Sequence, residues 1–336
     1  MPARYDALLL VSFGGPERMD DVMPFLENVV RGKDVPPERL RAVAGQYEAL
    51  GGRSPLPDQC RALIRAVEDL LGRAGPPLPV YWGNRNWHPL LADTLARMAA
   101  DGVSRALALL TSAYGSYPGC RQYLEDIERA RAAAGPRAPR VDKLRAFYNH
   151  PGFVEPLVER VKAAFDRMPH ERRDDARLVF TAHSLPLAMA RVSGYEAELR
   201  ETAALVAAPL GRRYALAFQS RSGRPGQPWL EPDVLDELGA LAAQGARDVV
   251  VAPVGFLSDH MEVVYDLDVQ ARARASELGL GMIRAQTVGA DPRFVAMVRE
   301  LVLERMEDAP PRFLGTRGPS PHACPEGCCV VSRGDA

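Results

Sequence analysis

The sequence predicts an α/β fold built on parallel sheets and arranged in two similar halves. Three observations support this: short apolar runs alternate with longer helical patterns, the runs are continuously apolar, and one helix–strand pattern occurs twice. A strand covered by helices on both faces is apolar throughout, whereas a strand with one wet face alternates. Alternating β and α elements therefore favour a parallel sheet with helices on both sides.

Eight short apolar runs are the predicted strands, and longer stretches with apolar residues at helical spacing lie between them. The predicted strands cover residues 7–13, 79–82, 105–110, 141–144, 178–182, 214–218, 249–253 and 282–284. The predicted helices include residues 61–71, 90–100, 156–167, 196–208, 234–243 and 292–306.

The repeated pattern joins a helix, a glycine and a buried strand. "DTLARMAADGVSRALALL" begins at Asp93 and "DELGALAAQGARDVVVAP" begins at Asp236, and each has a glycine where it can end the helix. Two βα halves of roughly 150 residues each would explain the match. We therefore predict a domain over residues 1–150, a second over 151–312, and a Pro- and Gly-rich extension over 313–336.

Composition excludes several classes of protein. The chain has 336 residues and a net charge of −1, so no overall field favours nucleic acid or an anionic membrane surface. No apolar run approaches the ~20 residues that a membrane helix needs. The apolar N-terminal stretch is typical of a first strand rather than a secretion signal, and five unevenly placed cysteines argue against a disulfide framework. We expect a cytoplasmic monomer with no nucleic-acid partner and no membrane span.

Ligands of open α/β sheets bind beyond the carboxyl ends of the strands, so the residues after each predicted strand are the candidate site. The first strand is followed by "FGGPE", residues 13–17, which fits a tight turn before a helix. The segment matches neither GxGxxG nor GxxxxGK[ST], which disfavours a nucleotide site.

His183 follows the fifth predicted strand, in "FTAHSLP". An isolated histidine at such a place ordinarily caps the next helix or satisfies a backbone group. The alternative is a functional role, because a neutral imidazole accepts protons near neutral pH.

The seventh strand is followed by "GFLSDHMEVVYDLDVQA", residues 255–271, which we predict to be a helix. Glu262, Asp266 and Gln270 are spaced by four residues and share one face of such a helix. Two stacked carboxylates repel each other unless a cation or water lies between them. The row is either a solvated surface or, with Asp259 and His260 beside it, a path for a partly hydrated divalent metal.

A Gly- and Pro-rich loop, residues 219–232, carries Trp229. An aromatic side chain in such a loop can form the wall of a site for a flat ligand. It can equally pack its own loop against the protein.

Five segments together carry a resemblance to one family: "LLLVSFGGPE", "QYEALGGRSPL", "FTAHSLP", "QSRSG…PWLEP" and "GFLSDHMEVVYDLD". They resemble the ferrochelatases, enzymes that insert ferrous iron into a porphyrin, and the resemblance extends to about Arg312. It implies two similar Rossmann-like domains, each a parallel sheet flanked by helices, with the active-site cleft between them.

The resemblance also implies roles for individual residues. His183 matches the family's essential histidine, and Glu262 matches its partner glutamate across the macrocycle, so the pair would remove the pyrrole protons. Gln270 departs from members that carry a further carboxylate there. The implied path for the substrate Fe²⁺ consists of Asp266, His260 and Asp259. The implied porphyrin-binding residues are Phe13, Arg31, Ser54, Tyr114, Tyr117 and Trp229.

The implied porphyrin is coproporphyrin III. The segment "LPDQCRALIRAVEDLLGR" lacks the apolar, membrane-facing lip of vertebrate-type ferrochelatases, and "YWGNRNWHP" and "SAYGSYPGCRQYLEDI" resemble the actinobacterial branch. A water-facing cleft suits the four propionates of coproporphyrin. The alternatives are protoporphyrin IX as substrate, a cobalt or nickel chelatase, and a carrier without chemistry. A downstream enzyme of haem synthesis is a candidate partner.

The same branch often carries a [2Fe–2S] cluster, which implies Cys120, Cys324, Cys328 and Cys329 as ligands. Four thiolates form a complete ligand set and would attach the extension to the core. The C-x3-C-C spacing departs from ferredoxin-type loops. A zinc site that uses His322, or plain thiols, remain alternatives, and Cys60 is expected to be a packing residue.

Overall fold

The computed structural model describes residues 4–32, 35–223, 226–325 and 327–330. The ends of the predicted first domain (residues 1–3) and of the predicted extension (residues 331–336) lie outside the described residues. Within the described part of the chain, no helix combines the length and the apolar character needed to cross a bilayer.

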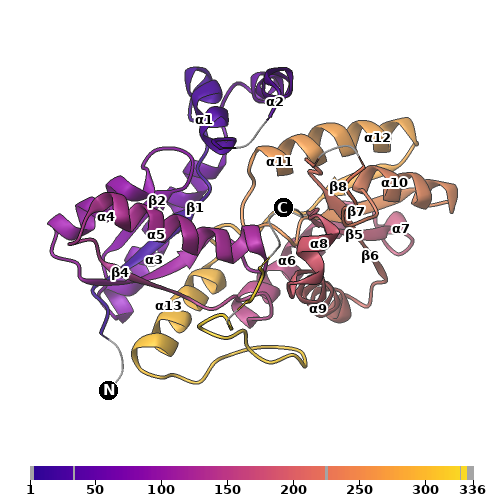
Figure 1. Cartoon of the computed structure of the whole chain (residues 1–336). Coiled ribbons are helices and arrows are strands. Elements are labelled where there is room, and N and C mark those ends of the chain that lie inside the picture. The colour runs from indigo at the N-terminus through magenta and orange to yellow at the C-terminus, as the bar shows by residue number, and fades with distance from the viewer. Residues whose placement is uncertain (1–3, 33–34, 224–225, 326, 331–336) are drawn as a thin grey trace. The chain divides into compact units, whose positions relative to one another are not determined.

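The chain forms two four-stranded parallel sheets with the same topology (Figure 1). Their strand orders are β2-β1-β3-β4 and β6-β5-β7-β8, so the second sheet repeats the first with every number raised by four. The strands are β1 (Ala7–Ser12), β2 (Val80–Asn84), β3 (Arg105–Leu110), β4 (Arg140–Lys143), β5 (Arg177–His183), β6 (Tyr214–Gln219), β7 (Asp248–Ala252) and β8 (Gly281–Arg284). This confirms the predicted repeat, all eight strands and the α/β class.

The chain divides into two compact units, each containing one sheet. The first comprises residues 1–111, 122–144 and 298–309, and the second comprises residues 112–121, 145–297 and 310–336. The predicted domains were continuous and met at residue 150, whereas each unit here is assembled from separated segments. Borders at 150 and 312 remain a proposal for the division of the chain.

The strands are connected by helices, as parallel pairing requires. In the first unit these are α1 (Val22–Val29), α2 (Pro37–Ala49), α3 (Leu56–Ala74), α4 (Leu91–Ala100) and α5 (Gln122–Ala134). In the second they are α6 (Pro151–Asp166), α7 (His170–Arg173), α8 (Leu187–Arg191), α9 (Tyr195–Ala207), α10 (Val234–Ala243), α11 (Met261–Val263) and α12 (Arg272–Glu277). Short 3-10 helices η1 (Met19–Asp21) and η3 (Ala208–Leu210) and π-helices η2 (Tyr117–Arg121) and η4 (Val264–Ala271) complete the set.

The last helix, α13 (Pro292–Met306), begins in the second unit and ends in the first. Its C-terminal half carries Arg299, which donates to the carbonyl oxygens of Ala74 and Gly75 at the end of α3. Arg305 donates to the hydroxyl of Tyr5, which precedes β1. The first unit therefore includes contacts between its N-terminal strand and residues close to the end of the chain.

Helices cover both faces of the second sheet (Figure 1). Helices α6 and α9 contact one another and the sheet, and α10 packs with η4 and α12. The core between the sheet and α10 contains Val249 and Val251 of β7 and Leu238 of α10, all with no exposed surface. The continuously apolar strands are explained by this double coverage.

Candidate active site

The candidate site lies at the carboxyl ends of β5 and β7. These strands pair with each other, and the chain proceeds from β5 outward to β6 and from β7 outward to β8. The strand order reverses between them, and ligands of open α/β sheets bind at such a switch point. His183 is the last residue of β5, and the segment that follows β7 carries Glu262.

The hydrogen bonds of His183 define its tautomer. Its Nδ1 lies 2.5 Å from the carbonyl oxygen of Ser184, which can only accept, so Nδ1 carries the proton and Nε2 of the neutral ring carries the lone pair. The backbone carbonyl of His183 accepts a hydrogen bond from the hydroxyl of buried Tyr195 at 2.9 Å. The strand end is thus fixed on both sides of the imidazole.

A carboxylate lies close to the other ring nitrogen of His183. Nε2 of His183 lies 3.6 Å from Oε2 of Glu262, whose side chain is 52% exposed. His260 lies on the other side of Glu262: its Nδ1 is 3.9 Å from the same oxygen and accepts from the Glu262 backbone N–H. Burial lowers the pKa of His260, so this ring is a neutral acceptor that caps the short helix α11.

Asp266 lies beside this pair, on the π-helix η4. Burial raises its pKa to about 6, although a hydrogen bond from the Ser220 hydroxyl lowers it and the charge of Glu262 raises it. The Ser220 bond is 2.5 Å long, and Ser220 itself has a φ of +62°, which is rare for a residue other than glycine. Gln219 donates to the backbone carbonyl of Glu262 at 3.2 Å. Strained backbone of this kind is concentrated at functional sites.

The segment "QSRSG" gave no sign of the hydrogen bonds that Ser220 and Gln219 make here. Sequence reasoning also predicted a helix from residue 255, which is wrong: regular helix begins at Met261, after a turn held by the bond from the Gly255 N–H to the Thr181 carbonyl. Val263 of α11 and Leu267 of η4, four residues apart, are both fully buried. Gln270 is exposed at the outer end.

The expectation that Glu262 lies across the macrocycle from His183 remains a prediction, and the distance between the two groups bears on it. A flat ring between two groups needs a gap of about 7 Å, two van der Waals contacts of ~3.5 Å each. The observed separation of 3.6 Å leaves no room for one. In this structure the two side chains therefore lie side by side.

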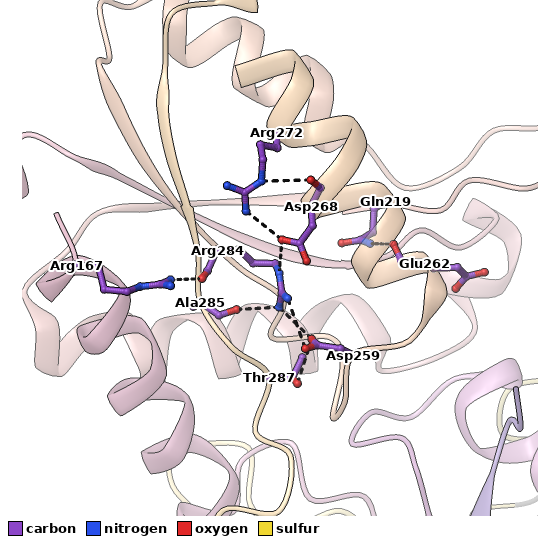
Figure 2. A network of polar contacts seen from close by, with 9 residues as sticks. All are labelled: Arg167, Gln219, Asp259, Glu262, Asp268, Arg272, Arg284, Ala285 and Thr287. Atoms are coloured by element: carbon purple, nitrogen blue, oxygen red, sulfur yellow. Dashed lines mark hydrogen bonds and ion pairs between the residues drawn. The ribbon is translucent and has the colours of Figure 1, made fainter. Parts of the chain in front are cut away.

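Asp259 takes a different direction from the acidic row. Its carboxylate accepts from Arg284 at 3.0 Å and from the Thr287 hydroxyl at 3.3 Å. Figure 2 shows this cluster, with the carboxylate of Glu262 pointing away from it. Because Asp259 is already paired, its position favours a structural role over contact with a metal.

Two of the implied porphyrin-binding aromatic residues are buried. Tyr114 is 2% exposed, donates to the Val254 carbonyl and packs edge-on against Tyr195. Trp229 is 7% exposed and its indole lies over Gly223, where a Cβ atom would approach Nε1 to 2.3 Å. These positions favour packing of their own loops. Tyr117, at the start of η2, is partly exposed.

The other three implied residues belong to the first unit. Phe13 follows β1 at the switch point of the first sheet, is 38% exposed and packs edge-on against Phe25. Ser54 is buried beside Gly15, and Arg31 is exposed and donates to the side chain of Asn28. Sequence reasoning missed the exposed apolar side chains of Met19 and Met23 in the same unit.

The four implied cluster cysteines all lie in the second unit, and their thiols are close together. The Cys120 thiol interacts with those of Cys324 and Cys329, and Sγ of Cys328 lies 3.5 Å from Sγ of Cys329. Hydrogen bonding to Cys324 lowers the pKa of Cys120, but the contact with Cys329 and burial outweigh it and raise the pKa. Cys329 is 1% exposed and has a φ of +57°. Cys60 is buried in α3, as expected for packing.

The extension is held on the second unit by polar contacts as well. Arg145 donates to the Arg312 carbonyl, Asn149 to the Gly318 carbonyl, and Arg121 to the Cys328 carbonyl. Glu201 accepts from the backbone N–H of Thr316. The thiols hydrogen-bond with one another, and no group of three or more His, Cys, Asp or Glu side chains in residues 4–32, 35–223, 226–325 and 327–330 is arranged to hold a metal ion.

Comparison with known proteins extends along nearly the whole chain. A family model described as ferrochelatase matches residues 5–306. A coproporphyrin III ferrochelatase of Frankia alni is 56% identical, over 98% of this chain and 87% of that protein. Another from Nocardia farcinica is 51% identical, over 98% and 97%. A protein of Rhodopirellula baltica named ferrochelatase is 48% identical, over 98% and 94%.

A solved structure shows the fold alone. The sirohydrochlorin chelatase SirB of Bacillus subtilis subspecies spizizenii, in complex with cobalt, aligns with a TM-score of 0.53 over 91% of this chain and 97% of its own, at 12% identity. The expected chelatase-like architecture of the two parallel sheets is thereby confirmed. With the family model and the full-length relatives, these findings show that the chain belongs to the ferrochelatase family.

Proposed function

We propose that this protein inserts Fe²⁺ into coproporphyrin III to give coproheme, a step of haem synthesis. The observation that carries the proposal is the pairing of His183 with Glu262 at the switch point of the second sheet in a chain of this family. The porphyrin is suggested by relatives that are 51% and 56% identical and are named coproporphyrin III ferrochelatases.

His183 is the proposed first proton acceptor. Metallation replaces two pyrrole N–H protons by one Fe²⁺, so two protons must leave as the metal enters. With Nδ1–H committed to the Ser184 carbonyl, Nε2 is the free base of the ring. Glu262, 3.6 Å away, stabilises the imidazolium that forms and passes the proton to water, because half of its side chain is exposed.

Glu262 and Asp266 are the proposed carriers of the substrate metal. Carboxylate oxygens are hard ligands that suit a partly hydrated divalent cation. The described residues contain no group of three or more His, Cys, Asp or Glu side chains arranged to hold a metal ion. The pair Glu262 and Asp266 is therefore better suited to passing a metal on than to storing it. His260, which caps α11, holds Glu262 in place rather than binding metal in this proposal.

The porphyrin-binding surface is assigned less completely. Phe13, with 38% of its surface exposed, is suited to contact with a flat apolar ring. Helix α3 buries Leu56, Leu63 and Val67, and among the described residues it contributes no exposed large apolar side chain. A helix α3 without exposed large apolar side chains favours the four propionates of coproporphyrin over the two of protoporphyrin IX.

An anaerobic assay tests the function. Fe²⁺ is added with coproporphyrin III or protoporphyrin IX, and the loss of the free-porphyrin spectrum is followed. We expect faster turnover of coproporphyrin III. His183→Ala should lower kcat by about 10²- to 10⁴-fold with little change in porphyrin binding. His170→Ala, on the exposed surface of α7, is the matched control. Faster turnover of protoporphyrin IX would overturn the substrate, and binding without metallation of either porphyrin would favour a carrier.

We further propose that Cys120, Cys324, Cys328 and Cys329 hold a [2Fe–2S] cluster. Their mutual contacts and the strained backbone of Cys329 support this, because four thiolates are the ligand set of such a cluster. The bound group would cross-link the extension to η2 within the second unit. Iron and acid-labile sulfide, measured on anaerobically purified protein, should fall to background in Cys120→Ser and be retained in Cys60→Ser. Stoichiometric zinc instead would favour the alternative site.

We place the protein in the cytoplasm, as a monomer that passes coproheme to an enzyme further along the pathway. None of the five cysteines, all of which lie in the described residues, forms a disulfide, which is usual in a reducing compartment. Fractionation of cells, and sedimentation of the purified protein, test the compartment and the monomeric state separately.

A further inference from the structure

Arg284, which is outside the proposed catalytic pair, contacts two carboxylates, one on each side of Glu262 in the sequence. Arg284 is the last residue of β8. Its Nε donates to Oδ1 of Asp268 at 2.8 Å, and its Nη1 donates to Oδ1 of Asp259 at 3.0 Å. Figure 2 shows the guanidinium group between these two carboxylates.

The two carboxylates bracket the proposed catalytic segment. Asp259 immediately precedes His260, whose ring caps the backbone N–H of Glu262. Asp268 lies on η4, two residues after Asp266. Whatever fixes Asp259 and Asp268 together therefore fixes the backbone from which Glu262 and Asp266 project.

The arginine is itself well fixed. Its backbone carbonyl accepts from Arg167 at 2.6 Å, and the N–H of Ala285 donates to the Val251 carbonyl at 2.8 Å. Only 14% of the Arg284 side chain is exposed, against 21% for Asp259 and 25% for Asp268. Shielded charge pairs are screened less than surface pairs, and a planar guanidinium can bridge two carboxylates where an ammonium cannot hold the same geometry.

We propose that Arg284 is a positioning residue for iron insertion, because it holds Asp259 and Asp268 at the same time and so sets the place of Glu262 relative to His183. It acts through these carboxylates and touches neither porphyrin nor metal. The inference rests on the proposed roles of His183 and Glu262.

Two variants test it with the full-length protein. Arg284→Lys keeps the charge but loses the two-sided geometry, and Asp268→Asn removes one anchor. For both we expect kcat/KM for Fe²⁺ to fall by about 10- to 100-fold, the effect of a misplacement of about 1 Å, with KM for the porphyrin unchanged.

Matched controls separate positioning from general stability. Arg172 forms a similar fork with Asp248, at 2.8 and 2.6 Å, at the opposite end of β7. Arg172→Lys should lower the thermal midpoint comparably but leave kcat/KM for Fe²⁺ unchanged. Arg272, which is 55% exposed and pairs with Asp268 alone, should be replaceable by glutamine with little effect.

Two results would overturn the inference. One is wild-type kcat/KM for Fe²⁺ in both folded variants, Arg284→Lys and Asp268→Asn. The other is an equal loss in Arg172→Lys, which would reduce the effect to stability. Glu262→Gln is measured beside them. If it loses activity while the Arg284 variants do not, positioning alone is wrong; if Glu262→Gln keeps full activity, the catalytic role and the inference fail together.

Discussion

Nε2 of His183 and Oε2 of Glu262 are 3.6 Å apart, one at the end of β5 and the other just beyond β7. Their two strands pair directly, and Glu262 lies on the short helix α11, which follows β7 after a turn. The two groups are thus close enough for the charge of one to affect the other. We therefore expect the two side chains to act together, so that the losses of activity caused by replacing each one are not additive.

A double-variant cycle tests this expectation. We expect His183→Ala/Glu262→Gln to lose no more kcat/KM for Fe²⁺ than the more damaging single variant, because residues that act together are strongly non-additive. Steady-state rates of the four proteins measure the coupling. Fully additive losses, expressed as logarithms, would show that the two side chains act in separate steps.

Asp266 should make stability depend on pH. Its folded pKa is raised to about 6 by burial, against an ordinary value of 3.8, so the folded state holds its proton longer than the unfolded state. Stability is therefore lost as the pH rises from 3.8 to about 6. Asp266→Asn escapes this loss and should be more stable than wild type by about 1–2 kcal/mol above pH 6, with the advantage vanishing near pH 4. Denaturant unfolding at both values measures it, and Asp69→Asn, an exposed carboxylate of α3, controls for loss of one charge.

Ser220 offers a test of stored strain. Both Ser220→Ala and Ser220→Gly remove the hydroxyl that donates to Asp266, but only glycine accepts the φ of +62° without cost. The glycine variant should be more stable than the alanine variant by about 1 kcal/mol. Equal free energies of unfolding would mean that the loop relaxes and that the strain is not imposed by its surroundings.

Gly255 should tolerate no side chain. A Cβ atom there would lie 2.5 Å from Cβ and 2.6 Å from Cα of Ala182, the residue before His183. Gly255→Ala should cost about 1–3 kcal/mol and reduce activity, because the backbone of β5 must shift. Gly239→Ala, on α10, meets only the tip of Arg274 at 3.5 Å and should be neutral or stabilising. A fully active, stable Gly255→Ala protein would contradict the close packing.

The fold could be predicted because each buried parallel strand is a continuous run of apolar residues in the sequence. Val263, Leu267 and Ala271 likewise have the four-residue spacing of a buried helix face. Partners of polar side chains could not be predicted in this way. The direction of Asp259 depends on Arg284, which ends a short strand whose sequence, "GMIR", carries no sign of its partners.

The sequence identified candidate residues of the site but not the distances between them. His183 and Glu262 could be identified by resemblance, but their separation depends on which strands pair, and a sequence does not state pairing. Trp229 shows the same limit: the loop composition left a ligand wall and packing of the loop equally open, and in the structure the ring covers Gly223. Burial of one aromatic ring depends on the local path of the chain, which Gly and Pro leave open.

Helix α13 limits when the first unit can finish folding. Its C-terminal half, with Arg299 and Arg305, completes the unit that begins with β1. Strand β1 is synthesised well before this helix, so the first unit cannot finish folding until α13 has been synthesised as well. Until then the first sheet lacks the helix that completes its unit.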